Sequence, residues 1–182
     1  MKILGINGSA RKQGNTAKLV KKILAGAKVV GHEVSYIDVA GLNIEPCLAC
    51  RYCRNHVGEC ITKDGMEAVC QQMLSADILV IGSPIYFATM TGNLKVLLDR
   101  VFFSKNLPAA PFAGKKVIVA YTQHQEDIAR FESYFALMER SLYGYMQMPV
   151  IASIVVGSTG EIDDILRQPA ALEEAQLIGK SL

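Results

Sequence analysis

The sequence lacks the hydrophobic runs that a membrane or exported protein needs. No stretch approaches the ~20 consecutive apolar residues that span a bilayer, and the opening run MKILGI is much too short for a signal peptide. An excess of one charge is also missing, since 19 basic and 17 acidic residues leave a formal net charge of +2. Such a small, dispersed excess favours neither a nucleic-acid partner nor a membrane surface. We therefore expect a cytoplasmic protein that binds neither.

The cysteines do not have the pattern of a disulfide framework. Five are present, which is an odd number, and no export signal accompanies them, so we expect reduced thiols. Hydrophobic residues make up 51% of the 182 positions and charged residues only 20%, which allows one sizeable core without disulfides. We expect a single domain over residues 1–182, because the chain contains no internal repeat and no long linker.

Short apolar runs alternate with segments of helical periodicity along the whole chain. The expected strands cover residues 1–6, 33–39, 77–82, 116–121 and 150–157, and the expected helices cover residues 15–30, 63–75, 93–103, 127–145 and 169–180. Strands that alternate with helices predict right-handed crossovers and a parallel sheet with helices on both faces. The irregular residues 42–62 form an insertion between the second strand and its following helix.

Small polar residues follow the first expected strand, in the segment NGSARKQGNT at residues 7–16. A helix that begins here offers unpaired backbone N–H groups and a positive dipole end, which suits a phosphate group. Ser9, Asn15 and Thr16 can add side-chain donors, and Arg11 can add positive charge. An ordinary capped helix start is the alternative, because Ser, Asn and Thr are common N-cap residues. The segment is neither a Walker loop nor the dinucleotide G-x-G-x-x-G motif.

A second loop of this kind follows the third expected strand. It reads GSPIYF from residue 82, then MTG at residues 90–92, and a helix follows. Ligands of open α/β sheets bind outside the carboxyl ends of the strands, where the strand order reverses. Tyr86 and Phe87 could instead be core residues at a strand end, but we expect the Ser-Pro pair to end the strand and turn them into a loop.

Together the two motifs, GSARKQGNT and SPIYFATMTGNLKVLLDR, resemble the NADPH-dependent FMN reductase branch of the flavodoxin-like flavoproteins. The resemblance covers most of the chain. It implies a flavodoxin-like three-layer sandwich, in which a five-stranded parallel sheet of order 2-1-3-4-5 lies between helices. It also implies FMN as the bound cofactor and NAD(P)H as co-substrate.

The resemblance assigns three sets of residues to FMN. The phosphate loop contributes Ser9, Arg11, Gly14, Asn15 and Thr16, and the isoalloxazine loop contributes Pro84, Ile85, Tyr86 and Phe87. Relatives often have a glycine-rich turn after the fourth strand, where this sequence has Thr122, Gln123 and His124. These three can still offer hydrogen bonds to the pyrimidine side of the ring, although His124 fits a solvated loop equally well. Because all of these side chains would bind and tune the cofactor, we nominate no catalytic residue.

Four cysteines, Cys47, Cys50, Cys53 and Cys60, fall within the insertion. A compact triple with one further cysteine is typical of a [4Fe–4S] site, whereas a four-thiolate zinc site usually gathers two separated pairs. The resemblance extends here to the iron–sulfur flavoproteins, whose cysteine motif lies in the same insertion. Metal-free thiols and zinc remain the alternatives, since wider relatives carry similar cysteines without a cluster.

The leading hypothesis is therefore an oxidoreductase in which FMN takes electrons from NAD(P)H and passes them on to a small-molecule or protein acceptor, with a [4Fe–4S] cluster as a second carrier. One alternative is an electron-transfer flavoprotein that receives electrons from a ferredoxin-like donor and does not use NAD(P)H directly. A second alternative is a redox or metal sensor that acts through its thiols. The resemblance also implies a homodimer or homotetramer.

Overall fold

Five parallel strands form one sheet in the order β2-β1-β3-β4-β5. This is a computed structural model, and it describes residues 1–101 and 111–182. The strands are β1 (Lys2–Asn7), β2 (Glu33–Asp38), β3 (Ile78–Pro84), β4 (Lys116–Thr122) and β5 (Val150–Val156). The predicted strand order is confirmed.

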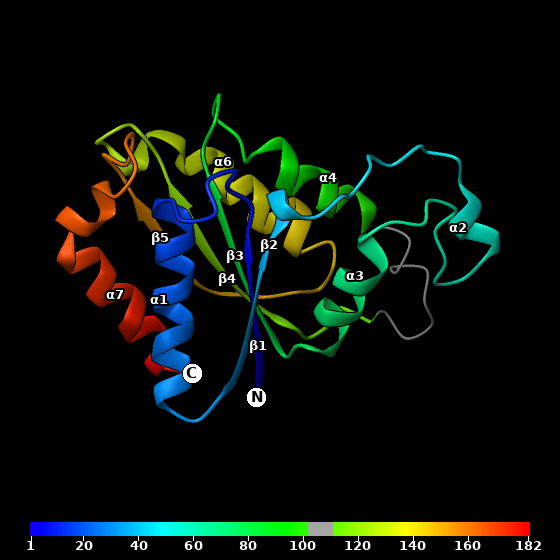
Figure 1. Ribbon diagram of the computed structural model, residues 1–182, viewed down its shortest axis with the longest axis horizontal. Coiled ribbons are helices and arrows are strands. Elements are labelled where there is room, and N and C mark those ends of the chain that lie inside the picture. The colour runs from blue at the N-terminus through cyan, green and yellow to red at the C-terminus, as the bar shows by residue number, and fades with distance from the viewer. Residues whose placement is uncertain (102–110) are drawn as a thin grey trace.

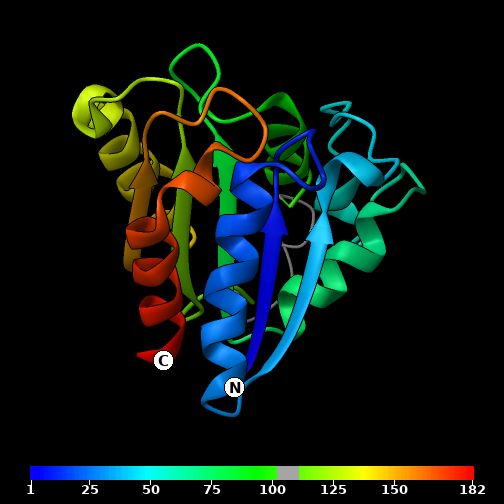
Figure 2. The same cartoon turned by 60° about the vertical axis from the view of Figure 1, so that its left-hand side comes forward.

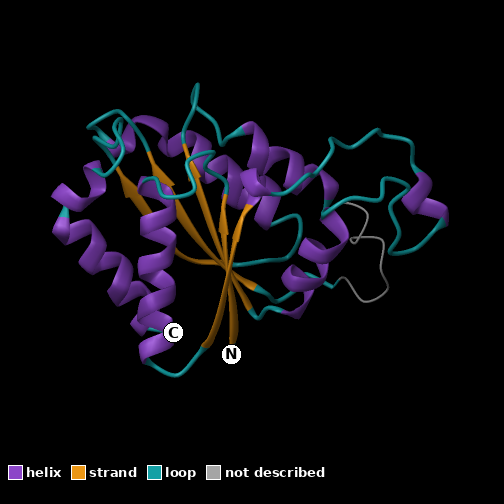
Figure 3. Cartoon of the chain, in the orientation of Figure 1, coloured by secondary structure: helices purple, strands orange, loops and turns teal. Residues whose placement is uncertain are grey.

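Helices cover both faces of this sheet (Figure 1, Figure 3). The α-helices are α1 (Asn15–Val29), α2 (Tyr52–Asn55), α3 (Met66–Ser75), α4 (Gly92–Arg100), α6 (Glu132–Met138) and α7 (Pro169–Lys180). Short 3-10 helices are η1 (Val39–Gly41), η2 (Ile128–Phe131) and η4 (Asp164–Arg167), and η3 (Glu139–Tyr143) is a π-helix. Helices α1 and α7 lie side by side on one face (Figure 2), and α3, α4 and α6 lie on the other. The flavodoxin-like sandwich is thus confirmed.

Each face has its own apolar core, because side chains of a strand alternate between the two faces. In β3, Ile78 and Val80 pack beneath α1 and α7, whereas Leu79 and Ile81 pack toward α3 and α4. All four side chains are buried. A strand that is covered on both sides must be apolar throughout, which explains the continuous run ILVIG.

Several expected boundaries are shifted by one to three residues, as at α3, which begins at Met66 instead of Lys63, and two larger differences concern β3 and the expected helix over residues 127–145. Strand β3 continues through Ser83 to Pro84, which pairs with Thr122 of β4. Proline is tolerated at the last position of this strand because the next residue, Ile85, supplies the N–H that donates to the Thr122 carbonyl. The expected helix over residues 127–145 is divided into η2, α6 and η3. Its π turn is closed by the Gly144 N–H, which donates to the Glu139 carbonyl five residues earlier at 2.8 Å. Of the expected helix 93–103, the last two residues lie outside the described ranges.

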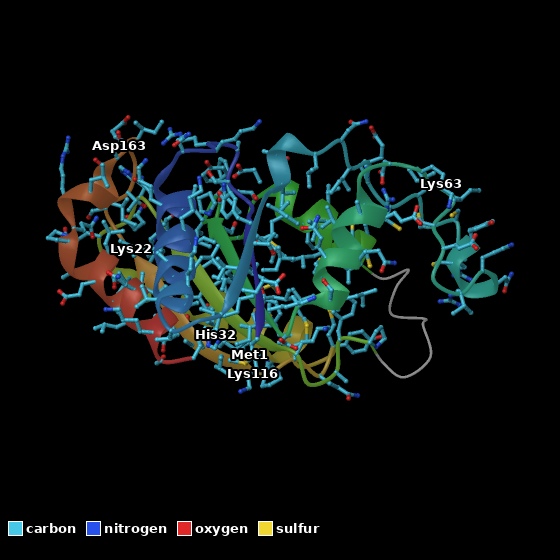
Figure 4. The ribbon with its side chains drawn as sticks, turned by 60° about the horizontal axis from the view of Figure 1, so that its bottom comes forward. Met1, Lys22, His32, Lys63, Lys116 and Asp163 are labelled. Carbon is cyan, nitrogen blue, oxygen red and sulfur yellow. The ribbon has the colours of Figure 1, made fainter. Side chains whose placement is uncertain are left out.

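The cysteine-containing segment extends away from the sheet on the side of α3 and α4, with α2 at its far end (Figure 1). At the opposite edge of the sheet, where the strands begin, Met1, His32 and Lys116 lie near one another (Figure 4). None of the helices in the described part of the chain is long and apolar enough to cross a membrane.

Candidate functional site

A pocket of about 210 Å³ opens at the carboxyl edge of the sheet. The loops that follow β1, β3, β4 and β5 all contribute to it. Its lining residues are Ser9, Arg11, Asn15, Thr16, Pro84, Ile85, Tyr86, Thr122, Gln123, His124, Thr159 and Gly160. Residues that the sequence assigned to FMN from three separate loops therefore share one pocket, while the assigned Gly14 and Phe87 lie outside its lining. That these residues bind FMN stays a prediction.

The loop after β1 is held open around this pocket by a buried asparagine. The Asn7 side chain donates to the Asp38 carboxylate at 2.8 Å and accepts the Ser9 backbone N–H at 3.2 Å. The Ser9 hydroxyl in turn accepts the Arg11 N–H at 3.1 Å, which leaves its own proton free to donate. A Cβ on Gly14, the N-cap of α1, would lie 2.8 Å from the Arg11 Cβ, so glycine permits the tight turn into the helix.

The first turn of α1 faces this loop with its N–H groups. No side chain in the described ranges caps this end of the helix, and its first turn carries no acidic residue. The positive end of the helix dipole is therefore not neutralised, which suits an anionic ligand. The Arg11 guanidinium adds charge beside it and donates to the Gly160 carbonyl at 3.1 Å.

Two buried threonines form the floor between β4 and α1. The hydroxyls of Thr16 and Thr122 are 2.6 Å apart, and both side chains are buried. Only one of the two protons can lie between the oxygens. The other hydroxyl keeps a proton that can be donated to a ligand.

The loop after β3 is a two-residue hairpin turn. Tyr86 and Thr89 exchange backbone hydrogen bonds of 2.9 and 3.1 Å, and Phe87 and Ala88 between them have positive φ angles of 48° and 64°. A left-handed backbone conformation is uncommon for residues other than glycine and costs conformational energy, so the surrounding structure must hold this turn in its shape. The turn projects beyond the sheet (Figure 1), with Tyr86 half exposed against the pocket and Phe87 fully exposed to solvent.

The hairpin is fixed to the loop after β1 by Thr91. Its hydroxyl donates to the Gly8 carbonyl at 2.6 Å and accepts the Leu94 N–H in the first turn of α4. The Thr91 N–H donates to the Ser83 hydroxyl at 3.1 Å. These contacts hold the two loops in one relative position.

The sequence did not predict that Thr159 and Gly160, which follow β5, line the pocket. The Thr159 hydroxyl and N–H both donate to the Gln123 carbonyl, at 2.9 and 3.0 Å, which fixes the loop after β4. Gly160 lies so close to His124 that a Cβ would be 2.4 Å from its Nδ1. One signal could have found them: β5 also ends at this edge, so its loop had to lie near the same site.

The Asn15 side chain has a structural role here. Its amide donates to the carbonyls of Thr159 and Glu161, at 3.2 and 2.7 Å, and its oxygen accepts the Ile165 N–H at 3.2 Å. Because the amide protons are used, contact between Asn15 and a bound phosphate would come from its backbone N–H. The side chain instead joins the start of α1 to the loop after β5.

The four clustered cysteines line a second cavity, of about 260 Å³, beside the carboxyl end of α4. Cys47 and Cys50 are exposed, and Cys53 and Cys60 are partly buried. Burial raises the pKa of the Cys53 thiol, and charge on Cys60, Cys47 and Cys50 raises it further. All four cysteines thus line one cavity. That they hold a metal or a cluster stays a prediction.

The backbone bends sharply within this cysteine segment. Ala49 and Arg51, on either side of Cys50, have positive φ angles of 52° and 60°. Turns of this kind align N–H groups into concavities that bind anions, iron–sulfur sites among them. Within residues 1–101 and 111–182, no three His, Cys, Asp or Glu side chains are arranged to hold a single metal ion.

The family model described as NADPH-dependent FMN reductase matches residues 1–161. An iron-sulfur flavoprotein of Methanocaldococcus jannaschii is 37% identical over 100 residues, which cover 55% of this chain and 51% of that protein. An iron-sulfur flavoprotein of Archaeoglobus fulgidus is 28% identical over 167 residues, covering 90% of this chain and 73% of that protein. The chain spans about half the length of the curated relatives that it matches over 100 residues.

Solved structures agree on the fold. The crystal structure of Smu.1420 from Streptococcus mutans UA159 superimposes with a TM-score of 0.78 at 20% identity, and the match covers 100% of both chains. At this identity the likeness concerns the fold alone.

Replacement of Asn15 by alanine tests the structural role of its side chain. Three hydrogen bonds to the loop after β5 would be lost in a buried position, so we expect unfolding to become easier by about 1–3 kcal/mol. Urea denaturation measures this loss, and amide hydrogen exchange over residues 159–165 should accelerate. An Asn15→Ala variant with wild-type stability and exchange would contradict the assignment.

Proposed function

The chain belongs to the NADPH-dependent FMN reductase family, and on that premise we propose that the pocket at the carboxyl edge of the sheet binds FMN for an NAD(P)H-dependent oxidoreductase reaction. The observation that carries this proposal is the convergence of three separate loops, after β1, β3 and β4, on one pocket. When bound, FMN supplies a centre that exchanges electrons in pairs or singly. The residues of this chain bind, orient and shield it.

The phosphate of FMN would lie at the start of α1. The uncapped helix end offers backbone N–H groups, the Ser9 hydroxyl keeps a free proton, and Arg11 adds a positive charge. The hydroxyl pair of Thr16 and Thr122 keeps one further donor beneath the same site. The donor set therefore suits a doubly charged oxyanion.

The isoalloxazine ring would lie between the hairpin after β3 and the loop after β4. Tyr86 offers an aromatic surface on one side, and the half-exposed position of its side chain leaves room for a nicotinamide to approach. On the other side, the Gln123 amide is already used by the carbonyls of Gln125 and Asp127, at 3.3 and 2.7 Å, while its buried oxygen has no partner among the described residues. A donor such as a ring N–H would satisfy that oxygen.

The cavity of the four cysteines would hold a [4Fe–4S] cluster. Its support is the convergence of four thiols on a volume of about 260 Å³, the left-handed turns around Cys50, and the names of the relatives as iron-sulfur flavoproteins. A cluster is larger than a single ion, so its ligand sulfurs stand farther apart than those of zinc. Zinc and metal-free thiols are the outcomes that would replace it.

A cluster near the flavin would allow single electrons to leave for a protein acceptor, whereas the flavin alone would serve a small acceptor that takes a pair. The donor would be NAD(P)H, in keeping with the family. A ferredoxin-like donor is the alternative, and failure of NADPH to reduce the flavin under anaerobic conditions would favour it.

Arg11→Gln tests the phosphate site. A charged hydrogen bond to a phosphate contributes about 1.5–3 kcal/mol, so the Kd for FMN should rise about 10- to 100-fold. Flavin fluorescence quenching measures the Kd. Riboflavin, which lacks the phosphate, should bind wild type and variant alike.

Lys12→Gln is the matched control for this variant. It removes the same charge from the same loop, but the Lys12 side chain is exposed and lies against Gly41. FMN binding should therefore hardly change. If Arg11→Gln weakened the binding of FMN and riboflavin equally, or if both variants lost FMN affinity equally, Arg11 would not bind the phosphate.

Iron analysis after anaerobic reconstitution with iron and sulfide tests the second cavity. We expect about four irons per chain, and their loss when Cys47, Cys50, Cys53 and Cys60 are all changed to serine. Cys70→Ala is the control, since Cys70 is buried in α3 and outside this cavity. One tightly bound zinc, or no metal in the wild-type chain, would refute the cluster while leaving the flavin site intact.

A further inference from the structure

Arg100, the last residue of α4, is buried beside the cysteine cavity. Its side chain is only 2% exposed, and it lines the cavity together with the four clustered cysteines. A buried guanidinium is rare unless it is paired, because burial removes a charge from water. The partners of Arg100 therefore indicate what this residue does.

The main partner is Asp64, which is 5% exposed. The two guanidinium nitrogens of Arg100 donate to the two oxygens of Asp64, at 2.8 and 3.1 Å. This is the bidentate geometry that arginine and carboxylate prefer. Burial alone would raise the pKa of Asp64, but hydrogen bonds from Arg100 and from two backbone N–H groups lower it overall.

The pair also binds both ends of the cysteine segment. Arg100 donates to the carbonyls of Glu45, at 2.6 Å, and Thr62, at 3.3 Å. Asp64 accepts the N–H groups of Glu45, at 2.9 Å, and Met66, at 3.0 Å. Glu45 stands two residues before Cys47, the first clustered cysteine, and Thr62 stands two residues after Cys60, the last.

One ion pair thus closes the loop of residues 45–64 at its base. Closing a flexible loop costs conformational entropy, and a buried bidentate pair with four backbone hydrogen bonds can offset that cost. All four clustered cysteines lie on the closed loop. Near the base, the Gly65 N–H also donates to the Asn43 carbonyl at 3.3 Å, while α2 is a single short turn at the far end.

The guanidinium also touches the site directly. Burial lowers the pKa of Arg100, but Asp64 and the adjacent Cys60 thiol raise it overall. The Nε of Arg100 is buried and has no hydrogen-bond partner among the described residues. Such a donor is costly unless an acceptor is added nearby, and a sulfur-rich anionic group in the cavity would provide one.

The opposite end of α4 begins at the flavin pocket. Thr91 caps the helix there and holds the Gly8 carbonyl. The nine residues of α4 extend about 13 Å along the helix axis. One rigid helix therefore joins the loop after β3 to the base of the cysteine loop.

We infer that Arg100 is a positioning residue for the cysteine cavity. It shapes the cavity by joining Glu45, Thr62 and Asp64 to α4, and it holds a positive charge beside Cys60. The loop closure stands on the contacts alone. The effect of the charge rests on the proposed cluster.

Hydrogen exchange on the iron-free protein tests the closure. In Arg100→Gln, amide exchange over residues 45–64 should accelerate at least tenfold while the strands keep their protection. Arg100→Gln leaves Asp64 buried without its partner, which opposes folding. The paired change of Arg100→Met with Asp64→Leu removes both charges and therefore serves as the second variant. Wild-type exchange of residues 45–64 in the paired variant would overturn the inference.

Lys95→Gln is the matched control. Lys95 carries the same charge on the same helix, but its side chain is exposed and pairs with Asp99 at 2.6 Å instead of the loop. Exchange over residues 45–64 should stay at the wild-type rate. Acceleration equal to that of Arg100→Gln would show that any lost charge on α4 loosens the loop, and would refute the specific role.

The iron-loaded protein gives a second readout, which a purely structural role would not move. Loss of the positive charge in Arg100→Gln should make the cluster harder to reduce. At a given potential, the ratio of reduced to oxidised cluster should fall about tenfold, which corresponds to a reduction potential about 59 mV lower for one electron. Arg100→Lys keeps the charge and should retain most of the potential without restoring slow exchange. A potential in Arg100→Gln equal to that of Lys95→Gln would overturn the role of the charge.

If the wild-type chain takes up no iron, the cluster fails as a proposal, and the exchange measurements still decide whether Arg100 closes the loop.

Discussion

The parallel pairing of β1 with β3 is the constraint on which the proposed flavin pocket depends. It sets Asn7, the last residue of β1, opposite Gly82, two residues before the end of β3. The Gly8 N–H then donates to the Gly82 carbonyl at 2.8 Å, and a Cβ on Gly8 would lie only 2.7 Å from the Leu94 Cβ. Glycine is needed for this close approach. Because the two loops leave the sheet side by side, one ligand can contact both.

Helix α4 connects the loops at this edge of the sheet to the cysteine segment. Thr91 fixes its first turn to the loop after β1, which lines the proposed flavin pocket, and its last residue, Arg100, holds the base of the cysteine loop. A displacement at either site would therefore strain the same helix. The family supplies the flavin chemistry, whereas the relative position of the two sites follows from the contacts of this one element.

The sequence predicted most of the fold and the meeting of three polar loops at one edge of the sheet. Continuous apolar strands and polar loops such as NGSARKQGNT are local signals, and parallel topology brings such loops to one edge. What it missed depends on contacts between distant residues. The Asn15 side chain holds the loop after β5. Thr159 and Gly160 lie in the pocket although more than 140 residues separate them from Asn15 and Arg11, which they contact. No local sequence pattern predicts the pairing of Arg100 with Asp64.

The most direct test of the account is a crystal structure of the chain grown with FMN. We expect the phosphate at the first turn of α1 beside Ser9 and Arg11, and the isoalloxazine ring between Tyr86 and the loop at Gln123 and His124. FMN bound elsewhere, or a pocket that stays empty of FMN at saturating concentration, would contradict it.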